Sequence, residues 1–381
     1  MTTWSVVKDD TRQKRRRDLI PRMALLACLA LVVVSLGMAF SPGSPKEPAE
    51  PPFSEQARSA ALIETMRLRD AGEGLGRSTA GGGQPAVART VSLLTSQARA
   101  LLLPGQDGPD SPPVAGPPSS AAPSAAPSSA PLPATAAALA TELAASASQR
   151  LADAAMADGG MARLLAAVGT AQLLQASSLA AAAGAPAPAV PDPAAPPLSG
   201  ACPSAPASPS PSSPPASSEA AASAGQDTGA ATLPGALAAI VRTELETVYG
   251  YQVALTRLSG DAAASASQQL ARHEALAAGA EDLSRMHCAA VPAREAGYTM
   301  APAFLASPAA GLGGLEASAL TAYGDLVALS EGQTRQWAIS GLVGAARWSA
   351  LWGADTGAVP GLAADPEAFP PLPAPSVTPS P

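Results

Sequence analysis

Aromatic residues are scarce in this sequence. Phe, Trp and Tyr make up 3% of the 381 residues, although 47% of the residues are hydrophobic, and alanine supplies most of that fraction. Because aromatic and β-branched residues favour strands, their scarcity argues against a large β-sheet protein. Long alanine and leucine tracts form helices readily, which argues against a chain disordered throughout. The composition therefore predicts an all-α protein, and a chain this long should contain more than one domain.

Positive charge is concentrated at the N-terminus. Residues 1–22 hold seven basic and three acidic side chains, a net charge of +4 in a chain whose net charge is -7. Residues 23–40 follow without any charge, and as a helix these residues would extend about 27 Å, close to the thickness of a bilayer core. This pattern predicts a single-pass anchor in the cell membrane, with residues 41–381 extracytoplasmic. The alternatives are a cleaved signal, after which the protein is secreted, and a buried soluble helix. The basic cluster adjoins a hydrophobic run, so we expect no nucleic-acid partner.

Proline-rich and alanine-rich segments divide the rest of the chain. The sequence predicts a tether with short helices at 53–69 and 87–103, separated by a glycine-rich break, and a helical hairpin around Gly159-Gly160. Two alanine-rich helices bury too little surface to be stable alone. The hairpin should therefore pack on the preceding helices, on the C-terminal region or on another copy. The expected boundaries are 41–103 for the tether, 104–133 for a disordered linker, 134–183 for the hairpin, 184–230 for a second disordered linker and 363–381 for a disordered tail.

Residues 231–362 form the region most able to fold by itself. All four tyrosines, three of the four tryptophans and both histidines lie between residues 233 and 353, and aromatic side chains bury the most surface. Short connections predict antiparallel neighbours, whereas the connection at 291–311 is long enough to cross over a bundle. The four expected helices cover residues 234–258, 261–290, 312–331 and 333–353.

Polar residues fall on the stripes that should face the core of this region. The stripe of the first helix contains Glu244 among six apolar or aromatic residues: Leu237, Val241, Val248, Tyr251, Leu255 and Leu258. Equivalent stripes place His273 on the second helix and Glu316 on the third. The sequence therefore predicts a buried polar cluster of Glu244, His273 and Glu316, neutralised by Arg335 or Arg347. The open alternative is that the helices are rotated and these residues face solvent.

The same helices carry a family resemblance. Residues 244–251 resemble the first helix of a ferritin-like domain of unknown function found in actinobacterial secreted and membrane proteins, and residues 272–276 resemble its second helix. Glu316 with Tyr323 resembles the third helix, and residues 335–353 resemble the fourth. The similarity covers about residues 233–362. The resemblance implies a ferritin-like four-helix bundle and no established activity.

The residues needed for known chemistries are largely missing. A ferritin-like di-iron site needs two Glu-x-x-His pairs, but Leu270 and Ser284 lie three positions before the two histidines, and residues 333–353 contain no acid. We therefore predict no metal and no cofactor, and keep a reduced metal site of Glu244, His273 and Glu316 as an alternative. The sequence also lacks Gly-x-Ser-x-Gly, Walker, dinucleotide-binding and Cys-x-x-Cys motifs, which disfavours an enzyme.

Cys202 and Cys288 both lie in the part expected outside the membrane, where an oxidising compartment permits a disulfide. The alternative is two free thiols.

Taken together, the sequence predicts a membrane-anchored, non-catalytic interaction or envelope-associated module. The second hypothesis is a metal-binding or oxidative ferritin-like module. The third is a self-associating helical scaffold, because the hairpin buries too little surface to be stable without a protein partner or a second copy.

Overall fold

A computed structural model describes residues 50–77, 85–102, 131–188, 195–200, 202, 231–362 and 368–372. The predicted anchor at 23–40 and the basic segment before it lie outside these residues, as does most of each predicted linker. Within the described ranges every regular element is a helix, as predicted. Residues 52–381 form one compact unit, distinct from residues 1–51. Because this unit contains its own hydrophobic core, we expect it to fold by itself.

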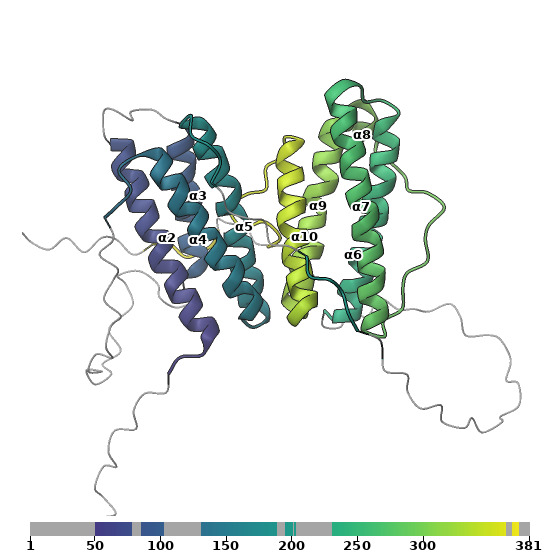
Figure 1. Cartoon of the computed structure of the whole chain (residues 1–381), viewed down its shortest axis with the longest axis horizontal. Helices are drawn as coiled ribbons and strands as arrows, with labels where there is room; N and C mark the ends of the chain where they lie inside the picture. Colours follow the sequence, from purple (N-terminus) through teal and green to yellow (C-terminus); the bar gives the residue numbers. More distant parts are fainter. Residues whose placement is uncertain are drawn as a thin grey trace, which may run out of the picture. The chain divides into compact units, whose positions relative to one another are not determined.

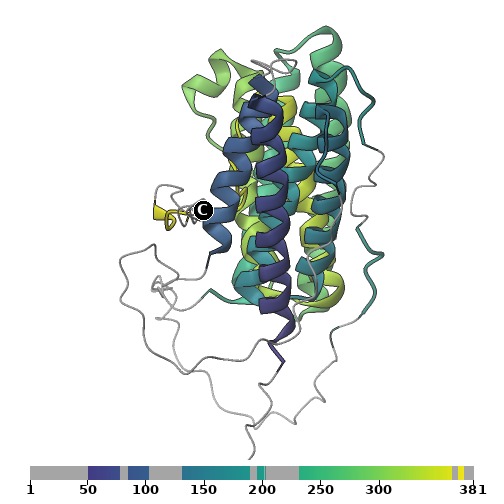
Figure 2. The same ribbon diagram turned by 90° about the vertical axis from the view of Figure 1, so that its left-hand side faces the viewer.

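Four long helices form an N-terminal helical group: α2 (Phe53–Arg77), α3 (Pro85–Leu101), α4 (Ala136–Met156) and α5 (Gly159–Ala182). Helices α2 and α3 pack side by side, as do α4 and α5, and α2 also packs on α4 (Figures 1 and 2). The Thr135 hydroxyl begins α4 by accepting the amide of Ala138 at 3.1 Å, as expected of an N-cap threonine. Fully buried leucines such as Leu68, Leu94 and Leu143 fill the space between these helices.

Helix α2 is longer than the sequence predicts, because it continues through the glycines where we expected a break. Gly72 explains the difference. A Cβ atom at this position would lie 2.8 Å from Cγ2 of Val91 on α3, so the missing side chain lets the two helices approach closely. Glycine in a helix interior is about 1 kcal/mol less favourable than alanine. At Gly72 the close packing of α2 against α3 outweighs this cost.

The C-terminal helical group consists of α6 (Leu233–Leu255), α7 (Gly260–Met286), α9 (Pro308–Leu329) and α10 (Gly332–Leu351). Helix α6 packs against α7 and α9, and α9 packs against α10. The long connection between α7 and α9 contains the short helix α8 (Pro302–Ala306), which the sequence did not predict. Helices α7 and α10 each pack on one neighbour of this group, α7 on α6 and α10 on α9. The cavities described below lie between α7 and α10.

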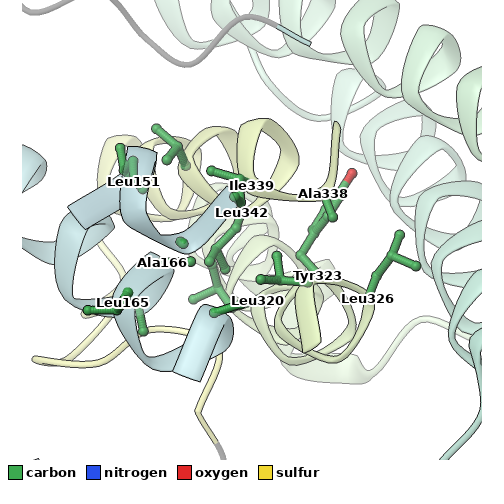
Figure 3. Packing of buried hydrophobic residues seen from close by; sticks show 14 of the residues in the cluster. Leu151, Leu165, Ala166, Leu320, Tyr323, Leu326, Ala338, Ile339 and Leu342 are labelled. Atoms are coloured by element: carbon green, nitrogen blue, oxygen red, sulfur yellow. The ribbon is translucent and has the colours of Figure 1, made fainter. Parts of the chain in front are cut away.

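The two helical groups share a core. Figure 3 shows Leu151 and Leu165, from α4 and α5, facing Leu320 of α9 and Leu342 of α10. Arg163 of α5 adds an ion pair with Asp325 at 2.6 Å. The hairpin therefore packs on both the preceding helices and the C-terminal group, which are two of the alternatives that the sequence left open. The regions expected as separate domains form one connected hydrophobic cluster.

Helix α5 is also the one helix among the described residues that is long and apolar enough to cross a membrane. Two thirds of its most apolar window, 67%, is buried inside the protein. Leu165, Val168 and Leu179 are among its fully buried residues. Its apolar character is accounted for by its place in the core, since a buried helix is hydrophobic on most of its surface.

Two described segments near the C-terminus, 358–362 and 368–372, contact α3. Gln97 donates from Nε2 to the carbonyl of Ala358 at 3.0 Å, and Arg99 donates from Nε to the carbonyl of Pro370 at 3.1 Å. Phe369 packs against the main hydrophobic cluster. Part of the region predicted as a disordered tail, residues 368–372, is therefore bound to the N-terminal helical group.

Candidate functional site

Three polar side chains meet inside the C-terminal helical group. His273 of α7 lies between Glu244 of α6 and Glu316 of α9, each of them at most 1% exposed. Nδ1 of His273 is 2.8 Å from Oε2 of Glu244, and Nε2 is 2.8 Å from Oε1 of Glu316. The structure thus brings together three of the four residues in the predicted polar cluster.

Two tyrosines and two tryptophans complete this cluster. The Tyr323 hydroxyl donates to Glu244 and the Tyr251 hydroxyl to Glu316, both at 2.6 Å. Trp352 donates from its indole nitrogen to the Tyr251 oxygen at 2.8 Å. The Tyr251 ring stacks on His273 with a centroid separation of 5.1 Å, and the rings of Trp348 and His273 form a T-shaped pair with centroids 4.9 Å apart.

Sequence reasoning placed Tyr251 and Tyr323 on the core-facing stripes but did not assign them to the polar cluster. The signal was present in their spacing. Each tyrosine lies seven residues after a glutamate on the same helix, Glu244 or Glu316. Seven residues is about two helical turns, so each tyrosine projects from the same face as the glutamate that precedes it.

His273 is held in its charged form. Burial by itself lowers the pKa of His273, but the hydrogen bonds to Glu244 and Glu316 and the charges of both carboxylates raise it to about 9. Both ring nitrogens must carry hydrogen to donate to two carboxylates at once. Burial raises the pKa of Glu316, and burial also raises the pKa of Tyr251 and Tyr323, which keeps both phenols protonated as donors. The cluster is therefore an imidazolium ion between two carboxyl groups.

Arg335, the fourth predicted member, lies elsewhere. Its Nε donates to the carbonyl of Val327 at 3.1 Å, and its Nη1 donates to the carbonyl of Ala157. It thereby joins the start of α10 to α9 and to the turn between α4 and α5. Arg347 is exposed on α10. The positive charge beside the two glutamates comes from His273. The prediction that Arg335 neutralises them is wrong, because the Arg335 side chain points to the other helical group.

The geometry does not favour the reduced metal site. The two ring nitrogens of an imidazole point in divergent directions, and here each faces a different carboxylate. One metal ion could therefore bind a single ring nitrogen and its neighbouring glutamate, but not all three side chains. Over the residues that the structure describes, no group of three or more His, Cys, Asp or Glu side chains is arranged to hold a metal ion.

Cys202 and Cys288 form a disulfide, with their Cα atoms 5.3 Å apart. Cys288 follows the end of α7 with a φ of 55°, and the amide of Ala289 donates to the carbonyl of Ser284 at 2.8 Å. This is the left-handed position after a helix that glycine usually occupies. We name residues 195–200 together with Cys202 the strap. The strap is also held by Gln333 of α10, whose Nε2 donates to the carbonyl of Ser199 at 2.6 Å.

Two adjoining cavities lie between α7, α10 and neighbouring segments. One has a volume of about 380 Å³ and the other about 640 Å³. Both are lined by Arg272, Arg347 and Trp348. Ala195 of the strap lines the smaller cavity, and Ala187 and Pro188 line the larger one. Trp348 thus lines both cavities and also contacts the His273 ring.

Comparison with curated proteins and comparison with solved structures each gave no match. A comparison with protein families gave a match over residues 236–364, which contain the polar cluster, Cys288 and most residues lining the smaller cavity. These residues match the family described as "Domain of unknown function (DUF4439)", which is of the ferritin-like type. The resemblance found from the sequence is confirmed, since the C-terminal third of the chain matches the model of this family.

Proposed function

We propose that this chain is a membrane-anchored extracytoplasmic protein whose C-terminal helical group is a ferritin-like four-helix bundle, used as a non-catalytic binding or envelope-associated module. In this proposal residues 23–40 anchor the chain, and the first residues of the tether, 41–51, connect the anchor to the folded unit. The domain family supports the bundle, and the disulfide between Cys202 and Cys288 supports an oxidising compartment.

The observation that carries the non-catalytic assignment is that His273, Tyr251 and Tyr323 form their hydrogen bonds inside the core. Both ring nitrogens and both tyrosine hydroxyls are used by partners inside the core. A general acid or base must reach a substrate proton, whereas these groups are buried and bonded to one another. A hydrogen-bonded polar network of this kind stabilises one arrangement of the helices.

Protease accessibility tests the proposed topology. Full-length protein with a C-terminal tag is produced in bacterial cells, which are converted to spheroplasts and treated with protease. We expect the tag in the membrane fraction and its removal by external protease without lysis. A tag recovered from the culture medium would identify the cleaved-signal alternative. A tag that is digested only after lysis would overturn the extracytoplasmic assignment.

Metal analysis tests the rival hypothesis of a metal-binding or oxidative module. Residues 52–381 are purified after growth with added iron, manganese and zinc, and the bound metals are quantified by mass spectrometry beside a His273→Gln variant. We expect no stoichiometric metal in either protein. One equivalent of metal in the wild type that is lost in the variant would contradict the non-catalytic assignment and favour the rival.

A further inference from the structure

The two cavities between α7 and α10 have a consistent chemistry. Their walls are mostly aliphatic or aromatic, including Leu276, Trp337 and Val343 at one cavity and Leu173 and Leu174 at the other. Volumes of about 380 and 640 Å³ fall in the range of small-molecule sites. Because Arg272, Arg347 and Trp348 line both cavities, the charged groups lie where the two apolar spaces meet.

Among the described residues that line these cavities, the charged side chains are both arginines. Arg272 comes from α7 and Arg347 from α10, and in the described part of the chain no acidic side chain lines either cavity. The Arg272 guanidinium lies 5.9 Å from the centre of a Trp348 ring, so the indole face supports its position. A guanidinium fork binds carboxylate or phosphate through two parallel hydrogen bonds. The junction is therefore suited to one anionic group.

A buried acceptor gives a second, independent indication of a ligand. Gln269 lines the larger cavity, is 5% exposed, and its Oε1 has no hydrogen-bond partner. Leaving a buried carbonyl oxygen unpaired costs about 1–3 kcal/mol. An N–H or O–H group on a bound molecule would satisfy this oxygen. Since Gln269 and Arg272 are three residues apart on α7, they lie on adjacent positions of one helical face.

We propose that these cavities bind an anionic amphiphile: a molecule with an acyl body, one carboxylate or phosphate group, and an N–H or O–H donor beside that group. The anionic group binds Arg272, the donor bonds to Oε1 of Gln269, and the acyl body lies against Trp348 in the apolar space. This inference rests on the proposed function, because it names the ligand class of the binding module.

Calorimetric titration of residues 52–381 tests the inference. The probes, all used below their micellar concentrations, are N-lauroylglycine, its methyl ester, laurate, lysophosphatidylglycerol with a lauroyl chain, and dodecyltrimethylammonium. We expect one molecule of N-lauroylglycine or of the lysophospholipid per protein, with the tighter of the two identifying the carboxylate or the phosphate as the preferred group. The ester and the cation, which lack negative charge, should bind at least tenfold more weakly.

Three variants separate specific binding from adsorption to apolar surface. Arg272→Gln should weaken binding of the anionic probes about tenfold, whereas the matched control Arg242→Gln, which changes an exposed arginine of α6, should bind as the wild type does. Gln269→Met should remove the preference for N-lauroylglycine over laurate, which has no N–H. Circular dichroism verifies that each variant is folded.

Two results would overturn the inference. One is equal affinity for the ester or the cation, or an equal effect of Arg242→Gln and Arg272→Gln. The other is no binding of either anionic probe by the folded protein. Either result leaves the proposed membrane topology intact, because that proposal is decided by protease accessibility. Conversely, a cytoplasmic location would remove the proposed function without changing the affinity measured here.

Discussion

The charged state of His273 predicts that alkaline pH destabilises the protein. The pKa of this imidazole is about 9 in the folded protein, against an ordinary value of 6.5. A group whose pKa is raised by folding contributes stability that is fully present below the unfolded value and is lost as the pH rises through the folded value. The loss should therefore occur between about pH 6.5 and pH 9. Burial also raises the pKa of Glu316, so the stability that protonated Glu316 contributes is likewise lost as the pH rises, starting at a lower pH than for His273.

The magnitude follows from the difference between these two pKa values. Each unit corresponds to about 1.4 kcal/mol, so a rise from 6.5 to about 9 contributes about 3 kcal/mol. That is a large fraction of the stability of a typical domain, which is about 5–15 kcal/mol. His273 is 1% exposed, so solvent screens its interactions little.

Urea unfolding of residues 52–381 at pH 6, 7, 8 and 9, followed by tryptophan fluorescence, measures this loss. The protein has two histidines, which provides a matched pair of variants. His273→Gln should be less stable at pH 6 and should show little further loss up to pH 9. His287→Gln, at the end of the same helix and exposed, should keep the wild-type pH dependence.

The reasoning is refuted if the wild type keeps its stability from pH 6.5 to 9, or if His273→Gln loses as much as the wild type over this range. Thiol exchange does not complicate the alkaline samples. The chain has three cysteines, of which Cys28 is absent from residues 52–381 and the other two are joined in the disulfide.

Three further variants test the packing, each by thermal or urea unfolding of residues 52–381. In Gly341→Ala the new Cβ would lie 2.0 Å from the ring of buried Tyr323, so we expect the free energy of unfolding to fall by about 1–3 kcal/mol. In the control Gly314→Ala the new Cβ meets no atom within 4 Å, and stability should rise by up to about 1 kcal/mol. Equal effects of the two substitutions would contradict this account. Cys202→Ser removes the disulfide and should lower stability by about 2–4 kcal/mol. Adding Cys288→Gly should restore about 1 kcal/mol, because the backbone at residue 288 is left-handed and glycine adopts that conformation without strain. No recovery would argue against strain at this position. Arg335→Met removes the donor to the carbonyls of Val327 and Ala157 and should cost about 1–3 kcal/mol, whereas unchanged stability would mean that water replaces it.

The helical period explains which parts of the site could be predicted. A seven-residue repeat correctly placed Leu237, Glu244 and Tyr251 inward on α6. However, Val248 and Leu255 are half-buried, and Thr247 and Ala254 are buried in their place. A straight helix has 3.6 residues per turn, so its buried stripe drifts from a strict heptad by about 20° per repeat.

Features that depend on tertiary contacts could not be predicted in this way. One partner of Arg335 is the carbonyl of Ala157, in the turn between α4 and α5 and far away in the sequence. The continuation of α2 through Gly72 depends on how closely α3 approaches. The cavities beside Arg272 are lined by the three helices α5, α7 and α10 and by segments of a proline-rich region that the sequence predicted as a linker. Periodicity indicates which side of a helix is buried, but not which neighbour covers it.

The hydrogen bonds from α3 to the carbonyls of Ala358 and Pro370 affect the order in which the protein folds. Gln97 and Arg99 take carbonyl partners 261 and 271 residues further along the chain. Synthesis proceeds from the N-terminus, so α3 emerges long before these partners exist. Contacts between such distant residues form late because the intervening loop must close first. A chain cut before residue 358 would therefore leave Gln97 of α3 without one of its native acceptors.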